Sequence, residues 1–286
     1  MRLGDRHLGI VGTGLIGGSL GLALRGRAAS VLGWDLDGDA LRRALVLGAV
    51  DEAASSLEAL CSRCDAVVLA LPPRHVVGTA EAIFRSGALP VVFNAASVQA
   101  RAFRVLSPLF SGRYAGFHPM AGRERGGIDN ADGELFRGAF CAVVADERTD
   151  GEVVDLAREL ARIIGAESGL LGPDDHDGAT ACVSHLPLLT ATALALAAGE
   201  ELDRRPDFAL LAGGGFRDTT RVAAGPAWMT ADLWAENEAL EGCLDRLIAT
   251  LQQMRRSTAD EMEDLARLGA SRREAALSRT FRRMRP

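Results

Sequence analysis

The chain has 286 residues, 48% of them hydrophobic, which is more than one compact core usually needs, so we expect two domains. Its 38 acidic and 32 basic residues give a net charge of −6, which argues against a nucleic acid or an anionic membrane as the partner. None of the basic residues is a lysine, so arginine must hold any anionic ligand.

Short apolar runs alternate with amphipathic helical stretches, such as residues 39–47, through the first part of the chain. This alternation of strands and helices predicts an α/β fold, in which a doubly wound, mostly parallel sheet of the Rossmann type is covered by helices on both faces. A helical stretch at 151–164 separates the last two predicted strands. The predicted strands are residues 8–11, 30–34, 66–71, 91–94, 114–117, 140–144 and 167–171.

The pattern changes at Gly172-Pro173-Asp174-Asp175, beyond which long stretches rich in Ala and Leu predict only helices. We therefore predict a first domain at 1–172 and an all-helical C-terminal domain at 173–286. Residues 179–202 are apolar around most of the helical circumference, which predicts burial within this domain or against a second subunit, and hence a homodimer. The charged stretch at 257–286 predicts a solvated or partner-packing terminal helix.

The N-terminus and the cysteines indicate a cytoplasmic protein. The first residues contain no charged-then-apolar signal region, and we expect no apolar run long enough to span a membrane. Five cysteines without framework spacing are typical of a reducing compartment. Cys61 and Cys64 form a CxxC pair, but no second pair follows, so we expect these thiols to pack in the core and predict no metal site.

A glycine-rich turn follows the first predicted strand. Its GTGLIG sequence is the GxGxxG pattern of dinucleotide-binding turns, in which backbone amides at the start of a helix bind the pyrophosphate. Asp35 ends the second strand, where a carboxylate can bind the ribose hydroxyls and repel a 2′-phosphate, so NAD is preferred over NADP. An empty tight turn and a solvated Asp35 are the alternatives. The predicted cofactor-binding residues are Gly12, Gly14, Leu15, Ile16, Gly17, Asp35, Leu71 and Pro72.

Unusual segments follow two later strands, at the sheet edge where ligands bind in open parallel sheets. Residues 94–97 read NAAS after one strand, and residues 116–124 read GFHPMAGRE after the next. The helical half adds SHLP at 184–187 and GGGFRDTTR at 213–221. A buried helix seldom needs His, Pro and Arg so placed for stability alone, so these four segments are candidates for one site.

Together the four segments resemble the prephenate and arogenate dehydrogenase family, in matching order from about residue 7 to about residue 250. The resemblance implies an NAD-dependent enzyme of tyrosine or related aromatic biosynthesis. In that family hydride leaves the ring carbon bearing a hydroxyl, the ring carboxylate departs as carbon dioxide, and the ring becomes aromatic. A small anionic substrate is therefore expected.

The resemblance also implies three catalytic residues. His118 would accept a hydrogen bond and then a proton from the substrate hydroxyl, because the pKa of an imidazole lies near working pH. Ser97 would fix the geometry of the hydroxyl and the histidine, and Glu124 would gate the mouth of the site. The alternatives are a backbone-bonded turn histidine at 118 and a simple helix cap at 97.

Three substrate-binding residues are implied in the helical half. Arg221 would grip a carboxylate through its guanidinium fork, Arg217 would add positive charge, and His185 would contact the substrate. The alternatives are an ion pair of Arg221 with Asp218 or Asp232 and a satisfied core histidine at 185. We interpret His7, His75 and His176 as structural.

The sequence departs from the family pattern in two places. Leu188 stands where members that use prephenate often carry a second histidine, and Asn94 and Gln99 replace the acid and the lysine of a DxxSxK segment. The ring substrate therefore stays open between prephenate, arogenate and an amino-substituted prephenate. Two alternative interpretations stay open. One is another dehydrogenase of similar layout, such as a 3-hydroxyacid dehydrogenase or an imine reductase, and the other is a catalytically inactive NAD-binding or sensing protein.

Overall fold

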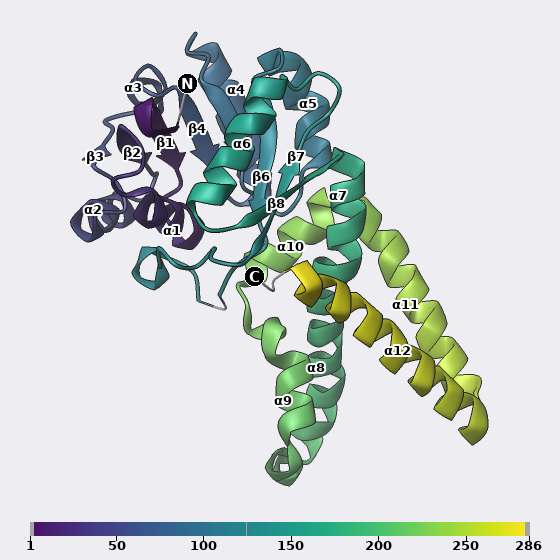
Figure 1. Cartoon of the computed structure of the whole chain (residues 1–286). Coiled ribbons are helices and arrows are strands. Elements are labelled where there is room, and N and C mark those ends of the chain that lie inside the picture. Colours follow the sequence, from purple (N-terminus) through teal and green to yellow (C-terminus); the bar gives the residue numbers. More distant parts are fainter. Residues whose placement is uncertain (1–2, 124, 284–286) are drawn as a thin grey trace. The chain divides into compact units, whose positions relative to one another are not determined.

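The computed structural model describes residues 3–123 and 125–283 (Figure 1). The chain divides into two compact units between Leu240 and Glu241. The first unit contains the sheet and the helices up to α10, and the second contains most of α11 (Ala239–Arg256) and all of α12 (Ala259–Arg283).

The described residues of the first unit form an eight-stranded sheet in the order β3-β2-β1-β4-β5-β6-β7-β8. Only β6 and β7 pair antiparallel among these strands. The chain steps outward from β1 to β3 and then returns to the other side of β1, which creates a topological switch between β1 and β4. This confirms the predicted doubly wound, mostly parallel sheet. The strands are β1 (His7–Val11), β2 (Ser30–Trp34), β3 (Glu52–Ala53), β4 (Ala66–Leu69), β5 (Val91–Asn94), β6 (Tyr114–Pro119), β7 (Phe140–Val144) and β8 (Glu167–Leu171).

Alternate side chains of the strands enter two hydrophobic cores, one on each face of the sheet. Val68 and Phe93 belong to the core that also holds residues of α1 and α6, whereas Val67 and Val92 belong to the core with residues of α3, α4 and α5. The period of two along each strand produces this division, because successive side chains point to opposite faces. The helices of this region are α1 (Leu15–Leu24), α2 (Gly38–Leu47), α3 (Leu57–Cys61), α4 (Pro73–Arg85), α5 (Ala100–Phe110) and α6 (Gly151–Ile163).

Two strand ends differ from the sequence prediction. β4 ends at Leu69 instead of residue 71, so Leu71 and Pro72 lie in the connection to α4. β6 continues to Pro119, so His118 lies within the strand instead of after it, paired with Ala142 of β7. The antiparallel ladder with β7 extends β6 because it supplies partners beyond the last residue that pairs with β5.

The rest of the first unit is helical, as predicted. One long helical segment runs through α7 (Pro173–Thr180), a single π-helical turn η3 (Ala181–His185) and α8 (Leu186–Arg204). The short elements η4 (Pro206–Leu211), α9 (Gly214–Thr220) and η5 (Arg221–Ala224) pack against α8, and α10 (Ala227–Glu236) packs against α4.

The burial and length of this segment correct two expectations. Burial of the helix within its own domain is wrong, because only 17% of its most apolar window is buried. Within the first unit, η4, α9 and η5 pack against α8 but leave Leu194 and Leu196 exposed. The expectation of no membrane-length apolar run is also wrong, because Pro173–Arg204 passes that test by length and composition. Its first turns nevertheless hold buried polar residues, which are rare where a helix faces lipid.

The second unit begins its last helix with a capping box. The backbone N–H of Thr258 donates to the carboxylate of Glu261 at 2.8 Å, and the N–H of Glu261 donates to Oγ1 of Thr258 at 3.4 Å. This reciprocal pair satisfies free amides at the start of α12, which confirms the predicted terminal helix over its described length.

Candidate active site

The glycine-rich turn joins β1 to α1, beside the topological switch. Gly12 has a φ of +89°, and a Cβ at this residue would lie 2.5 Å from the carbonyl oxygen of Ala70. A Cβ on Gly17 would lie 1.9 Å from the carbonyl oxygen of Gly12, so these two glycines are required by close packing. Gly14 differs, because a Cβ there would have nothing else of the described chain within 4 Å. The turn thus leaves open space at the N-terminus of α1, which fits a pyrophosphate group.

Asp35, beyond the end of β2, is hydrogen-bonded to this turn. Its Oδ2 accepts the backbone N–H of Thr13 at 2.6 Å and the Thr13 hydroxyl at 3.0 Å, while its Oδ1 accepts the N–H of Asp37 at 2.9 Å. Asp35 is therefore not a merely solvated residue. Each carboxylate oxygen has two lone pairs, so Oδ1 keeps capacity for a ribose hydroxyl. Leu71 also lies beside the turn, with its Cδ2 2.9 Å from the position of a Cβ on Gly12.

The loop after β5 is held by two buried amide side chains. Nδ2 of Asn94 donates to Oε1 of Gln99 at 3.1 Å, and Nε2 of Gln99 donates to the carbonyl oxygens of Asn94 at 3.1 Å and Ala96 at 2.7 Å. The two departures from the DxxSxK pattern thus occur together, and a neutral hydrogen-bonded pair occupies the positions of an acid and a lysine. The half-buried Ser97 lies on this loop, three residues before α5, whose N-cap is Gln99 and not Ser97.

His118 is the central buried imidazole of the candidate site. Its Nδ1 lies 2.9 Å from Nε2 of His176, whose Nδ1 lies 2.8 Å from Oδ1 of Asp177. Burial, with added effects of His176 and His185, lowers the pKa of His118 from 6.5 to about 3, so the ring is neutral at physiological pH. A backbone-bonded turn histidine was the alternative, and the partner here is a side chain.

His176 and Asp177 were missed by sequence reasoning. His176 was interpreted as structural, and Asp177 was not considered, yet both side chains are almost fully buried at the start of the helical region. The carboxylate of Asp177 also accepts the backbone N–H groups of Gln99 and Ala100, each at 2.8 Å. The sequence carries little signal for them, because α7 reads PDDHDGAT and such a polar stretch is typical of an exposed helix start.

His185 ends the π-helical turn and is 1% exposed. Such turns are frequent at functional sites, because they interrupt the regular helical hydrogen bonding. Nδ2 of Asn237 lies 3.0 Å from Nδ1 of His185, whereas Nε2 of His185 is buried without a hydrogen-bond partner in the described chain. Burial lowers the pKa of His185 to about 4, with Asp177 acting in the opposite direction. His185 is therefore not a satisfied core histidine.

The predicted arginines lie on short helices that pack against α8. Arg217 is exposed and pairs with Asp218 at 3.4 Å, and Arg221 is exposed on η5. Asp232, one of the two acids considered for Arg221, pairs with Arg74 at 3.0 Å. Glu124 lies outside the described residues. The structure therefore brings His118 and His185 into one electrostatic environment, and it places Arg217 and Arg221 at exposed positions of the helical region.

Arg74 links the sheet to the helical region and was also missed. It follows β4 at the first turn of α4, bonds the buried carboxylate of Asp232 on α10, and lies 5.8 Å from the ring centroid of Trp228. A buried carboxylate needs such a partner. This contact connects the cofactor side of the sheet to α10, whose C-terminus leads directly to Asn237.

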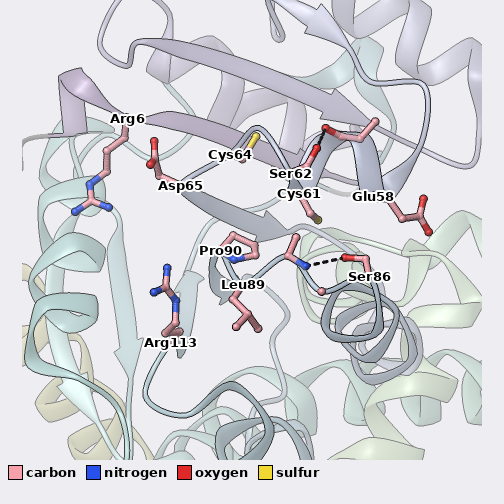
Figure 2. A pocket seen from close by; sticks show the side chains of 13 residues that line it. Arg6, Glu58, Cys61, Ser62, Cys64, Asp65, Ser86, Leu89, Pro90 and Arg113 are labelled. Carbon is pink, nitrogen blue, oxygen red and sulfur yellow. Dashed lines mark hydrogen bonds between the residues drawn. The ribbon is translucent and has the colours of Figure 1, made fainter.

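A cavity of about 690 Å³ lies at the opposite edge of the sheet (Figure 2). Arg6, Asp65, Pro90 and Arg113 each directly precede a strand, so the cavity is at the N-terminal ends of β1, β4, β5 and β6. Ligands of open parallel sheets bind at the other edge. Burial raises the pKa of the two CxxC thiols that line the cavity, Cys61 and Cys64, to about 12, so they stay protonated at neutral pH.

Comparisons with known proteins cover both halves of the chain. Residues 20–170 match a family model described as prephenate dehydrogenase, nucleotide-binding domain, and residues 172–270 match one described as prephenate dehydrogenase, dimerization domain. A prephenate dehydrogenase of Bacillus subtilis (strain 168) is 28% identical over 266 residues, which cover 91% of this chain and 71% of that protein.

Solved structures give the same result. The arogenate dehydrogenase of Synechocystis is 30% identical with a TM-score of 0.79, over 94% of this chain and 99% of that one. The prephenate dehydrogenase of A. aeolicus, crystallised with hydroxyphenyl propionate and NAD+, is 26% identical with a TM-score of 0.83, over 96% of this chain and 98% of that one.

Proposed function

The chain belongs to the prephenate dehydrogenase family, and on this premise we propose that it catalyses the NAD-dependent oxidative decarboxylation of a prephenate-like cyclohexadiene in tyrosine or related aromatic biosynthesis. The observation that carries the proposal is the buried imidazole of His118 on β6, hydrogen-bonded to His176 through one ring nitrogen. A chain that only bound or sensed NAD would have no need of such a base.

NAD fits the residues around the first turn. Gly14 leaves space for the pyrophosphate, and the amides of Leu15 and Ile16 open α1. Leu71 borders the turn, and Pro72 follows it as the N-cap of α4. Asp35 would accept ribose hydroxyls and repel a 2′-phosphate, and Leu36 beside it is 90% exposed and carries no charge, so NAD is preferred over NADP. When bound, NAD accepts the hydride from the ring carbon.

His118 would take the proton of the substrate hydroxyl. As hydride leaves the carbon that bears this hydroxyl, the O–H bond breaks toward the imidazole and the bond from the ring to its carboxylate breaks. The electron pair of that second bond enters the ring, which becomes aromatic, and carbon dioxide is released. A neutral imidazole is required at the outset, and the lowered pKa of His118 ensures it. Because this pKa lies below working pH, the proton transfer draws on the aromatisation of the ring more than on the basicity of the imidazole.

The remaining predicted residues would hold the substrate. Arg221, aided by Arg217, would bind a substrate carboxylate through its planar guanidinium. Ser97 would orient the hydroxyl toward His118, and Glu124 would act near the mouth of the site. His185 would contact the ring substrate through Nε2, which has no hydrogen-bond partner among the described residues.

The substrate side chain is open between three candidates. The Asn94–Gln99 pair replaces two charges by neutral amides, and the apolar Leu188 stands where members that use prephenate often carry a second histidine, so the candidate site differs in polarity from the family pattern. These changes concern the group attached to the ring and leave the reacting carbon untouched. Prephenate, arogenate and an amino-substituted prephenate therefore share the proposed reaction.

A homodimer through the helical region is part of the proposal, as is a cytoplasmic location. Residues 172–270 match a dimerization domain, and α8 exposes large apolar side chains such as Leu194 and Leu196. An apolar face of this kind is costly to leave in water, so a second copy of the chain would cover it. We accordingly propose residues 1–172 as the cofactor half and residues 173–286 as the substrate-binding and dimerisation half.

The direct test incubates the purified chain with NAD and each of the three candidates while NADH formation is followed by absorbance. We expect turnover with at least one candidate and release of one carbon dioxide for each NADH. NADP in place of NAD should give slower turnover. Absence of NADH with all three candidates, in a protein shown to bind NAD, would refute the proposed reaction.

A further inference from the structure

A buried hydrogen-bond network surrounds Asp177 and reaches two imidazoles of the candidate site. We propose that Asp177 sets the proton positions of both rings, so that His118 offers an unprotonated Nε2 and His185 a protonated Nε2 to the same substrate. The proposal rests on the proposed function for the identity of that substrate. It makes Asp177, His176 and Asn237 positioning residues, because each acts through a histidine.

The first branch of the network runs through the carboxylate of Asp177. Both oxygens accept backbone N–H groups at the start of α5, and an ionised carboxylate can only accept, so Nδ1–H of His176 is the donor to Oδ1. In this proposal His176 carries a single proton, on Nδ1, so its Nε2 has a lone pair. Its neighbour at 2.9 Å, Nδ1 of His118, must therefore carry a proton. The lone pair of His118 is left on Nε2, the nitrogen that is free to accept a proton from a substrate.

The second branch runs through the backbone carbonyl of Asp177. Nδ2 of Asn237 donates to this oxygen at 3.0 Å, and Oδ1 of Asn237 accepts the N–H of Ala239 at 3.0 Å. A carbonyl only accepts and a backbone amide only donates, so these two partners fix the orientation of the Asn237 amide. The second hydrogen on Nδ2 then points to Nδ1 of His185, which must be the acceptor. The proton of His185 is consequently on Nε2.

The two rings are thus complementary. His118 presents an acceptor, which suits a hydroxyl that loses its proton, and His185 presents a donor, which suits a carboxylate or carbonyl oxygen. The Nε2–H of His185 is buried without a partner in the described chain, and a buried donor is costly unless a ligand atom completes it. The opposite proton positions would place a donor against the hydroxyl proton and block its transfer.

The first experiment reads the proton positions without any assay. The isolated enzyme is labelled with ¹⁵N in its five histidines, and NMR distinguishes a protonated from an unprotonated ring nitrogen at neutral pH. We expect Nδ1–H for His118 and His176 and Nε2–H for His185, with assignments from single His variants. Neutral histidine free in water favours Nε2–H, so an Nδ1–H form at 118 needs a cause. Nε2–H at 118 or Nδ1–H at 185 would overturn the proposal.

The second experiment perturbs the first branch. Asp177→Asn should move the proton of His118 to Nε2 and lower kcat by about a hundredfold or more, with KM for NAD unchanged, because a base in the wrong tautomer cannot accept. Asp175→Asn, on the exposed side of α7, is the matched control and should behave as the parent enzyme. Since Asp177 also holds the start of α5, His176→Leu is a second variant that keeps this anchor, and we expect the same kcat loss. Parent-like kcat in folded His176→Leu would overturn this branch.

The third variant, Asn237→Asp, perturbs the second branch. A carboxylate at 237 can only accept, so Nδ1 of His185 gains the proton and Nε2 loses its donor role. We expect KM for the ring substrate to rise by roughly tenfold, as for a lost hydrogen bond to a charged group, with a smaller change in kcat. A kcat loss without a KM change would contradict the assignment. If the NMR result is as expected but no candidate is turned over, the proposed function fails and the proton assignment stands.

Discussion

The sheet region (residues 3–171) buries two large hydrophobic cores, whereas the helical region (residues 173–240) buries a cluster of polar side chains and few apolar ones. All members of the two large hydrophobic cores belong to the sheet region. In the helical region the buried side chains include His176, Asp177, Thr180, His185, Asp232 and Asn237. Its large apolar side chains, by contrast, include exposed ones, namely Val183, Leu194, Leu196, Leu210, Leu211, Trp228, Met229 and Trp234.

The contrast indicates different sources of stability. The hydrophobic effect holds the sheet region together within one chain, whereas the helical region is ordered by a polar network against the sheet and, in our proposal, by a second subunit. In our proposal, polar groups inside the helical region position the site, and apolar groups on its surface form the dimer interface. Substitutions in the two regions should therefore change different measurable quantities.

The largest effect is expected where a side chain of the sheet region joins the polar network. His118→Asn should lower kcat by about 10²–10⁴-fold while the dissociation constant of NAD stays unchanged, because the variant lacks the base. Stopped-flow kinetics and NAD titration measure the two quantities. His7→Asn is the control, because His7 is exposed and lies at the N-terminal end of β1. Full activity of His118→Asn would show that the base lies elsewhere.

The second effect concerns the packed cores. Phe93→Ala removes a fully buried ring from β5 and should lower the free energy of unfolding by about 3–5 kcal/mol. Leu196→Ala, at a site that is 68% exposed within one chain, should change the stability of the monomer by less than about 0.5 kcal/mol. Urea unfolding at low protein concentration measures both. Equal losses for the two variants would contradict the contrast between the regions.

The third effect concerns association. Leu196→Asp would place a charge in the proposed dimer face and should raise the dimer dissociation constant by about a hundredfold or more. Val46→Asp introduces the same charge on α2 of the sheet region, where Val46 is 77% exposed, and should leave the dimer intact. Analytical ultracentrifugation over a concentration series separates these outcomes. A parent enzyme that sediments as a monomer throughout would remove the proposed dimer.

The smallest expected effect is the change in the free energy of unfolding per unit of pH that the two buried imidazoles cause. The folded pKa values of His118 and His185, about 3 and about 4, lie below the usual 6.5, so the unfolded chain binds protons first as the pH falls. The free energy of unfolding should therefore fall below pH 6.5, by about 1.4 kcal/mol per pH unit for each histidine. Urea unfolding between pH 6.5 and pH 5 measures the slope. The slope should be smaller in His118→Asn, and an unchanged slope would exclude this histidine as its source.

Local patterns account for what could be predicted. The alternation of Val67, Val68 and Leu69 across the two cores, and the glycines at 12 and 17, depend on neighbours a few residues away or on a motif of fixed spacing. His118 could be named from the segment around it. The exposure of α8 could not be predicted from the sequence, because an apolar helix has the same sequence whether its own domain or a second subunit covers it.

By itself the sequence determined the α/β sheet, the dinucleotide turn, the helical second half and the family resemblance, because periodicity and motifs are properties of adjacent residues. Tertiary structure alone decided that His176, 58 positions from His118, bonds to it, and that Asn237, 60 positions from Asp177, bonds to its carbonyl. Side chains so far apart meet only where the sheet and the helices pack together. Which ring nitrogen of each imidazole carries the proton follows from these long-range contacts, and no local sequence pattern encodes them.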